Sequence, residues 1–222
     1  MINNSIKGKL AVFDQDNTLL DGRFIFRAAE ELGFVSELNR VMSEEQDSVK
    51  RAVIIASMLK GVTRDKILNI AESINLVDGA CQTIDALKQQ GFIIGIITDS
   101  YDIVANLIKE KAGADFAIGI RLIFENDTAT GEIEIPSEYF KSEVSLCMHN
   151  YCKGHAFVNA AKIRSISLGN TVAVGDGEND ICMIKAAAAG IAFCSQSDLL
   201  NSAADKKIKE KNLLKILEFC NI

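Results

Sequence analysis

Four aspartates in two short motifs are the first sign of chemistry in the 222-residue sequence. Asp14 and Asp16 follow the apolar run KLAVF, and Asp176 and Asp180 lie in GDGEND, directly after the apolar run TVAV. Carboxylates that share one crevice raise one another's pKa values unless a cation neutralises them. Mg²⁺ prefers such hard oxygen ligands and commonly shares its coordination with phosphate groups. The pattern therefore predicts a magnesium-dependent phosphoryl site.

Each motif by itself also has a purely structural explanation. A DxD sequence after a strand is often a turn or a helix N-cap, and GDGEND is compatible with a polar turn. The two glycines of GDGEND would also let the backbone approach a ligand closely. Because both motifs follow apolar runs in one chain, we favour a shared functional site.

The elements that position these residues are predicted by alternating strand and helix patterns. Short apolar runs typical of buried parallel strands occur at 9–13, 92–98, 115–118, 171–174 and, more weakly, 190–193. Helical patterns occur at 80–90, 101–112, 153–167 and 180–189. This alternation predicts a doubly wound, mostly parallel α/β sheet. Ligands of such a sheet bind at the carboxyl ends of its strands, where the four aspartates and the Thr98–Ser100 segment would meet.

The connection after the first strand is too long for a single crossover helix. Residues 19–78 show helical periodicity at 23–32, 45–59 and 63–74, so we expect them to form a small helical cap. The α/β core would then comprise residues 1–18 and 79–222. Within it, alternation around NDTATG predicts a β-hairpin with a loose turn at about 119–136, closed by Pro136.

Composition excludes several classes of partner. The net charge of −6 and the pI near 5.1 do not supply the basic face that nucleic acid requires. No apolar run is long enough to span a membrane, and the first ten residues lack the apolar region of a signal peptide, so we expect a cytoplasmic protein, either a monomer or a homodimer. The six cysteines form no CxxC pair and are expected to be reduced, mostly buried thiols.

With these motifs in view, the chain resembles the haloacid dehalogenase (HAD) superfamily, and within it the phosphoserine phosphatase-like branch. Its four motifs occur here in the same order along the chain. They are DxDxT at Asp14 to Thr18, a Ser or Thr after the next strand at Thr98, a lysine at Lys153, and GDGxND at Gly175 to Asp180. Lys162 is the alternative candidate for the lysine.

The resemblance implies an enzyme, a HAD-type phosphatase that hydrolyses a small phosphate ester through an aspartyl-phosphate. Asp14 would be the nucleophile, and Asp16 would protonate the leaving oxygen and later activate water. Mg²⁺ would be held by Asp14, by the backbone carbonyl of Asp16 and by Asp176. Asp180 would contact a metal-bound water, or would contact the metal ligands without binding the metal itself.

The remaining residues of the resemblance would contact the phosphate. Thr98 offers a hydroxyl and Lys153 a positive charge to the phosphoryl oxygens. Asn179 would touch the phosphate or the leaving group.

Four positions depart from the phosphoserine phosphatase pattern. Arg23 stands where that branch has a glutamate for the amino group of the substrate, and Ile55 falls where it has an arginine for the carboxylate. Asp99 and Ser100 replace the usual Gly-Gly after the second motif, and their side chains would narrow the space for the substrate along that wall. The site thus lacks the glutamate that would accept a hydrogen bond from an amino group, and it gains the positive charge of Arg23. This change favours an anionic or polyol phosphate, so we expect a substrate other than phosphoserine.

The segment CMHNYCKGH contains both histidines of the protein and two cysteines. Cys147, His149, Cys152 and His155 suggest zinc, but their spacing fits no common zinc pattern, and Lys153 in their midst would oppose a cation. We therefore expect an ordinary loop and helix start.

Two alternatives to a phosphatase stay open at this stage. A phosphotransferase would pass the aspartyl-phosphate to an acceptor alcohol. A receiver-like phospho-switch would use a similar acidic pocket without turnover. The helical insertion argues against the switch, because it suits a lid that excludes water.

Overall fold

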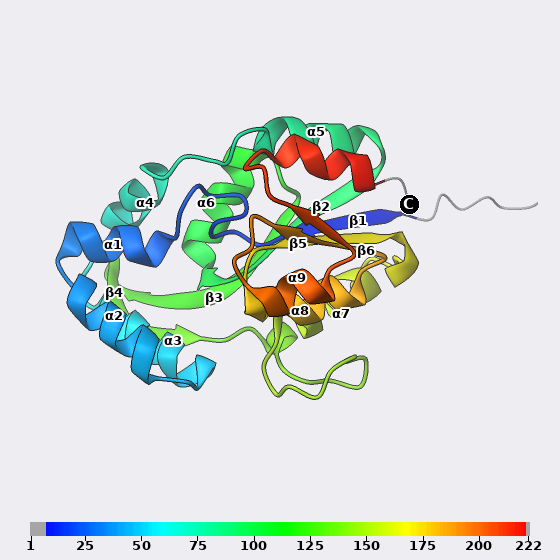
Figure 1. Cartoon of the computed structure of the whole chain (residues 1–222). Coiled ribbons are helices and arrows are strands. Elements are labelled where there is room, and N and C mark those ends of the chain that lie inside the picture. The colour runs from blue at the N-terminus through cyan, green and yellow to red at the C-terminus, as the bar shows by residue number, and fades with distance from the viewer. Residues whose placement is uncertain (1–7, 221–222) are drawn as a thin grey trace, which may run out of the picture.

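A single seven-stranded sheet organises residues 8–220, the part of the chain that the computed structural model describes (Figure 1). The strands are β1 (Lys9–Phe13), β2 (Phe92–Tyr101), β3 (Phe116–Glu125), β4 (Thr128–Glu134), β5 (Thr171–Gly175), β6 (Ala189–Phe193) and β7 (Lys206–Ile208). Their order is β4-β3-β2-β1-β5-β6-β7, and every neighbouring pair is parallel except β3 and β4. The predicted doubly wound α/β fold is confirmed.

Helices cover both faces of the sheet because its central strands are apolar on both sides. Ala11 and Phe13 of β1 pack toward α5 (Ala80–Gln89) and α6 (Asp102–Ala112). Leu10 and Val12 pack toward the helices of the other face, α7 (Lys153–Ile163), α8 (Ile181–Ala186) and α9 (Asp198–Ala203). Successive residues of a strand point to opposite faces, so a continuous apolar run is buried on both.

The insertion after β1 contains four helices, which lie together at the left of Figure 1. They are α1 (Phe24–Leu32), α2 (Val35–Glu44), α3 (Ser48–Ser57) and α4 (Arg64–Glu72). Local signals explain their boundaries: Gly33 ends α1 in a left-handed conformation, and Asp47 caps α3 by accepting from two backbone N–H groups. Helix α2 was not predicted. The division into a core (1–18 and 79–222) and a cap (19–78) remains our proposal.

The hairpin at the edge of the sheet differs from its prediction in two ways. The expected strand at 115–118 and the first arm of the hairpin are one continuous strand, β3, which pairs with β2 in its first half and with β4 in its second. The turn is also tight, because Asn126 and Asp127 both adopt positive φ angles of 47° and 62°. Arg64 of the cap forms an ion pair with Asp127 at 3.0 Å, so the hairpin contacts the cap as well as the sheet.

The remaining helices end earlier than predicted, at Ile163 for α7 and at Ala186 for α8. Strand β7, helix α9 and the 3₁₀ segment Leu213–Phe219 were not predicted. Among residues 8–220, no helix is long and apolar enough to cross a membrane. The prediction that the first ten residues are not a signal peptide rests mostly on residues 1–7, which lie outside the described part of the chain.

Candidate active site

The DxDxT segment begins at the end of β1, in the middle of the sheet. The backbone N–H of Asp14 donates to the carbonyl of Val174 in β5 at 2.8 Å, which places its carboxylate at the strand ends. The chain then turns through Asn17, which has a φ of 58°. The carboxylate of Asp16 accepts from the backbone N–H of Phe24 at 3.0 Å. Asp16 therefore lies between the sheet and the first cap helix.

The GDGEND loop is folded around the carboxylate of Asp180. One of its oxygens, Oδ2, accepts from the backbone N–H groups of Asp176 and Gly177, each at 3.1 Å. A Cβ on Gly175 would lie 2.3 Å from this oxygen, so the position requires glycine. Gly175 thus makes room for Asp180, a role that the sequence did not indicate, and the close approach of these glycines to a ligand stays a prediction.

Lys153 connects the two aspartate motifs. It is the first residue of α7, is 2% exposed, and places its ammonium 2.6 Å from Asp14 Oδ1 and 2.9 Å from Asp180 Oδ1. Burial alone would lower the pKa of Lys153, but the two carboxylates raise it well above its usual value. Lys162, the alternative candidate, is exposed near the other end of α7.

The carboxylates are short of positive charge despite Lys153. Oxygens of Asp14, Asp176 and Asp180 lie within 4.8 Å of one another. Burial raises the pKa of Asp14 and of Asp180 to about 7, since Lys153 offsets only part of the effect. Burial and the nearby charge of Asp180 also raise the pKa of Asp176. Hard oxygen donors that lack sufficient positive charge around them suit a divalent cation such as Mg²⁺.

The four predicted metal residues are not equivalent in the structure. Both oxygens of Asp180 are already engaged, by Lys153 and by the loop backbone, so its side chain holds the loop and the lysine. The side chain of Asp16 is turned toward α1, and burial raises its pKa while the Phe24 N–H opposes the rise. Asp14 and Asp176 are left as the carboxylates best placed to reach a cation. Asn17 orients Asp176 through a 3.1 Å hydrogen bond.

Strand β2 continues through the second motif, whereas the prediction ended it at Thr98. Thr98 is 1% exposed and its hydroxyl oxygen accepts from the backbone N–H of Ser100 at 3.0 Å. Asp99 accepts from the Tyr151 hydroxyl at 2.6 Å and from the Asn179 side-chain amide at 2.7 Å. The predicted residues Asp99 and Asn179 are therefore paired with each other.

Two tyrosines that the sequence motifs did not indicate support this wall. The Tyr139 hydroxyl donates to the carbonyl of Thr98 at 2.6 Å, and its ring stacks on that of Tyr151 with 5.3 Å between the centroids. Burial raises the pKa of both phenols, so both stay protonated and donate. No spacing signal links them to β2, because they come from the irregular segment before α7.

A cleft of about 690 Å³ lies between the strand ends and the cap. Asp14, Thr98 and Lys153 line its floor, and Arg23 and Ile55 line it from the cap side. Arg51, one helical turn before Ile55 on α3, also lines the cleft. The i, i+4 spacing was the available signal for Arg51, since it places both residues on one face of the helix.

Comparison with known proteins agrees with this fold and site. A model of the haloacid dehalogenase-like hydrolase family matches residues 9–188. The chain belongs to this family of hydrolases.

Its relatives place it in the phosphoserine phosphatase-like branch, which confirms the resemblance drawn from the motifs. The chain is 35% identical over 220 residues to a phosphoserine phosphatase of Methanocaldococcus jannaschii, covering 96% of this chain and 98% of that protein. Two solved structures are also similar. One, of a phospho-aspartyl intermediate analogue of phosphoserine phosphatase, has a TM-score of 0.82 at 34% identity and covers 96% of this chain and 99% of that one. The other, an apo phosphoserine phosphatase, has a TM-score of 0.80 at 36% identity with the same coverage.

Proposed function

We propose that the protein is a Mg²⁺-dependent phosphomonoester hydrolase that acts on a small metabolite through a phosphorylated Asp14. The observation that carries the proposal is the ion-paired cluster of Asp14, Lys153 and the fully buried Asp180, of which Asp14 and Lys153 line the floor of the cleft. A buried carboxylate held this way is positioned as a nucleophile and cannot rotate freely. One of the similar solved structures is of a phospho-aspartyl intermediate analogue of a phosphoserine phosphatase, which supports the same intermediate here.

In the first half of the reaction, an Asp14 oxygen forms a bond to phosphorus as the bond to the leaving oxygen breaks. Asp16 donates a proton to that oxygen, so the product leaves as an alcohol. Its raised pKa keeps more of Asp16 protonated near neutral pH than an exposed aspartate would be. Lys153 and the Thr98 hydroxyl stabilise the charge that spreads over the phosphoryl oxygens. When bound by Asp14 and Asp176, Mg²⁺ would neutralise charge so that one anion can approach another.

In the second half, water replaces Asp14 on phosphorus. Asp16, now ionised, takes a proton from the attacking water, and the bond between phosphorus and Asp14 breaks to release inorganic phosphate. Both proton transfers involve one side chain, so Asp16 ends the cycle protonated as it began. The hydrogen bond from Phe24 ties its position to α1 and thus to the cap.

For the substrate, we propose a phosphate ester with a second anionic group. Arg23 and Arg51 line the cap side of the cleft. Arg23 also lies close enough to Asp16 and Asp176 to oppose the rise of their pKa values. Two guanidinium groups favour carboxylate or phosphate on the far end of the substrate.

Phosphoserine is the second candidate, because the relatives of the chain carry that name. In that case Arg51 would bind the carboxylate of the substrate. Asp99, which lines the same cleft, would be the acceptor for its ammonium group.

A panel of phosphorylated metabolites, assayed for released phosphate with Mg²⁺, separates the two candidates. We expect dianionic esters without an amino group to give the highest kcat/KM, and Arg23→Glu to shift the preference toward phosphoserine by about tenfold or more. A wild-type preference for phosphoserine would support the second candidate. Hydrolysis of no member of the panel would contradict both.

The phosphotransferase alternative uses the same intermediate and differs only in the acceptor. Adding a series of alcohols and analysing the products distinguishes them, since a phosphotransferase yields new phosphate esters in place of inorganic phosphate. The receiver-like switch is not retained, because the chain belongs to a hydrolase family.

A further inference from the structure

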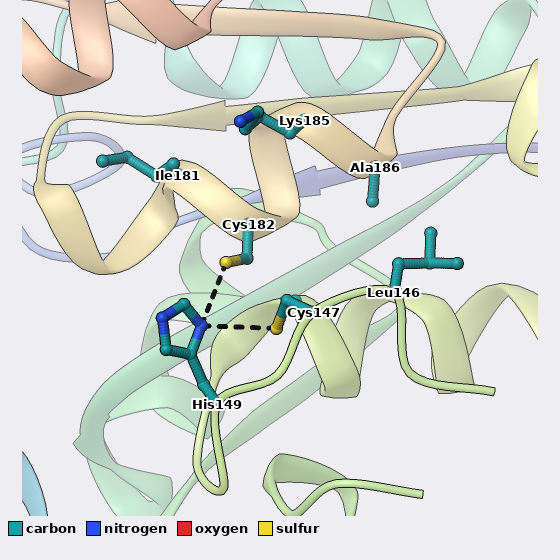
Figure 2. Close-up of a pocket in the computed structure, with 8 residues that line it drawn as sticks. Leu146, Cys147, His149, Ile181, Cys182, Lys185 and Ala186 are labelled. Carbon is teal, nitrogen blue, oxygen red and sulfur yellow. Dashed lines mark hydrogen bonds between the residues drawn. The ribbon is translucent and has the colours of Figure 1, made fainter. Parts of the chain in front are cut away.

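A second group of side chains with metal-binding chemistry lies beside the active-site cleft. Cys147, His149 and Cys152 come from the segment before α7, and Cys182 comes from the first turn of α8. One ligand atom from each of the four lies within 4.8 Å of the other three. Figure 2 shows His149 between two of the thiols, with its Nδ1 3.3 Å from Cys147 Sγ and 3.4 Å from Cys182 Sγ.

We propose that Cys147, His149, Cys152 and Cys182 bind one Zn²⁺ ion in a closed tetrahedral site. Three thiolates and one imidazole form one of the standard ligand sets of structural zinc. Zinc bonds of about 2.3 Å to sulfur and about 2.0 Å to nitrogen require ligand atoms roughly 3.5–3.8 Å apart in a tetrahedron. The two distances from His149 Nδ1 to the thiols, 3.3 and 3.4 Å, lie just below this range and no pair of ligand atoms is more than 4.8 Å apart, so small side-chain rotations complete the site.

The sequence argument against zinc fails on two points in the structure. Lys153 does not face the thiols, because its ammonium is turned to Asp14 and Asp180, which compensate its charge. The fourth ligand is Cys182, which is distant in the sequence, and not His155. His155 instead places its Nε2 2.7 Å from the carbonyl of His149. This hydrogen bond fixes the backbone carbonyl of His149 and so helps to position the residue.

Backbone contacts hold Cys152 and Cys182 close to each other, although burial raises the pKa of both thiols in the metal-free chain. The sulfur of Cys152 accepts from the backbone N–H of Gly154 at 3.2 Å, at the start of α7. A Cβ on Gly154 would lie 2.7 Å from Cys182 Cβ, so glycine lets α7 and α8 approach closely enough for Cys152 and Cys182 to meet. Lys185 lines the adjoining pocket of about 330 Å³ and offsets the net negative charge of three thiolates and one Zn²⁺.

The loop that carries the ligands lacks other strong anchors at its tip. Residues 141–150 form no helix or strand, and Leu146 and Met148 are 65% and 82% exposed (the yellow-green loop at the bottom of Figure 1). Its ends are joined by the bridge between Phe140 and Tyr151. Long irregular loops in compact domains generally need such a constraint or a function. A zinc ion would tie the loop tip to α8.

This site is independent of the proposed phosphatase reaction, although the two are neighbours. His149, Cys152 and Cys182 also line the active-site cleft, and Cys152 directly precedes Lys153. With four protein ligands the ion has no open position for substrate, so its role is to hold the cleft wall and the start of α7.

The test measures zinc bound to the full chain, kept reduced with a phosphine, given excess Zn²⁺ and then desalted. We expect about one zinc per chain by mass spectrometry. Competition with a chromogenic chelator should show the affinity falling at least about 100-fold in Cys147→Ser and Cys182→Ser, because loss of a ligand exceeds the effect of losing an outer partner. Cys81→Ser is the matched control, since Cys81 is also half-buried but lies outside the cluster on α5.

Three further variants locate the ion. Asp176→Asn should keep its zinc if the ion sits among the thiols, and lose it if the ion occupies the carboxylate site. His155→Gln, which retains an N–H donor, should bind zinc more tightly than His149→Gln. The proposal is overturned if the reduced wild-type chain retains no zinc, or if the Cys147→Ser and Cys182→Ser variants bind it as tightly as Cys81→Ser.

Discussion

At the scale of single residues, the site depends on one buried ammonium group that forms ion pairs with two carboxylates. Lys153 pairs with Asp14, the proposed nucleophile, and with Asp180, which holds the GDGEND loop. Removing one partner of a buried ion pair is costly because it leaves an uncompensated charge. Lys153 therefore contributes to folding as well as to the proposed chemistry.

The Lys153→Met variant is expected to lose about 3–5 kcal/mol of stability at neutral pH, since Asp14 and Asp180 then lack their counter-ion. The loss should shrink at pH 5, where both carboxyls, with pKa values of about 7, are protonated. Urea unfolding at the two pH values measures it. Lys162→Met is the matched control on the same helix and should change stability by less than about 0.5 kcal/mol, because Lys162 is exposed. An equal loss at both pH values would contradict the charge argument.

Replacing Asp14 by Asn should lower kcat at least about a thousandfold, because the amide is a poor nucleophile toward phosphorus. The circular dichroism spectrum should be unchanged, since the shape of the side chain is kept. Asp85→Asn, on the exposed side of α5, controls for the loss of one negative charge. Residual turnover near the wild-type rate would exclude Asp14 as the nucleophile.

At the scale of elements, the connections that follow the strands set the geometry of the site. The loop after β5 wraps the Asp180 carboxylate, and the irregular segment before α7 supplies Tyr139 and Tyr151 to the wall beside β2. The hairpin β3–β4 reaches from the sheet to the cap, where Arg64 also packs over the Phe124 ring at 4.0 Å. Rigid packing at these connections positions side chains that come from distant parts of the chain.

Substitution of Gly175 by Ala tests the loop after β5. The added Cβ would lie 2.3 Å from Asp180 Oδ2, so the carboxylate must move and its bonds to the loop backbone and to Lys153 must lengthen. We expect a loss of about 1–3 kcal/mol in stability and a kcat at least tenfold lower. In Gly169→Ala the nearest atom would be 3.6 Å away, so this control should behave as wild type. Wild-type kinetics in Gly175→Ala would mean that Asp180 does not position the site.

At the scale of the whole molecule, the uncompensated carboxylates link stability to pH and to metal. Burial raises the pKa of Asp14 and Asp180 in the folded protein from 3.8 to about 7. A carboxyl with a raised folded-state pKa contributes its full stability below its unfolded pKa and loses it as pH rises through the folded value. Without Mg²⁺, these two groups therefore favour folding at pH 4 and oppose it increasingly toward pH 7.

The melting temperature should accordingly respond to Mg²⁺ in a pH-dependent way. We expect saturating Mg²⁺ to raise it by several degrees at pH 7.5 and by little at pH 5, because the cation binds the ionised carboxylates. Differential scanning fluorimetry at a series of pH values measures the effect, and Asp14→Asn should diminish it. A Mg²⁺ effect that is the same at pH 5 and pH 7.5 would refute this linkage.

The sequence by itself determined the fold class, the strands that end at the site and the identity of its acidic residues, because periodicity and motif spacing are local properties. Only the tertiary structure decided that Gly175 makes room for Asp180, that Asp99 pairs with Asn179, and that Tyr139 and Tyr151 support the second motif. It also decided that Cys182, and not His155, completes the thiol cluster, and that Arg51 lines the cleft beside Ile55. These contacts join residues from different elements, and their distances depend on how α7, α8 and the cap pack against the sheet, which no local pattern encodes.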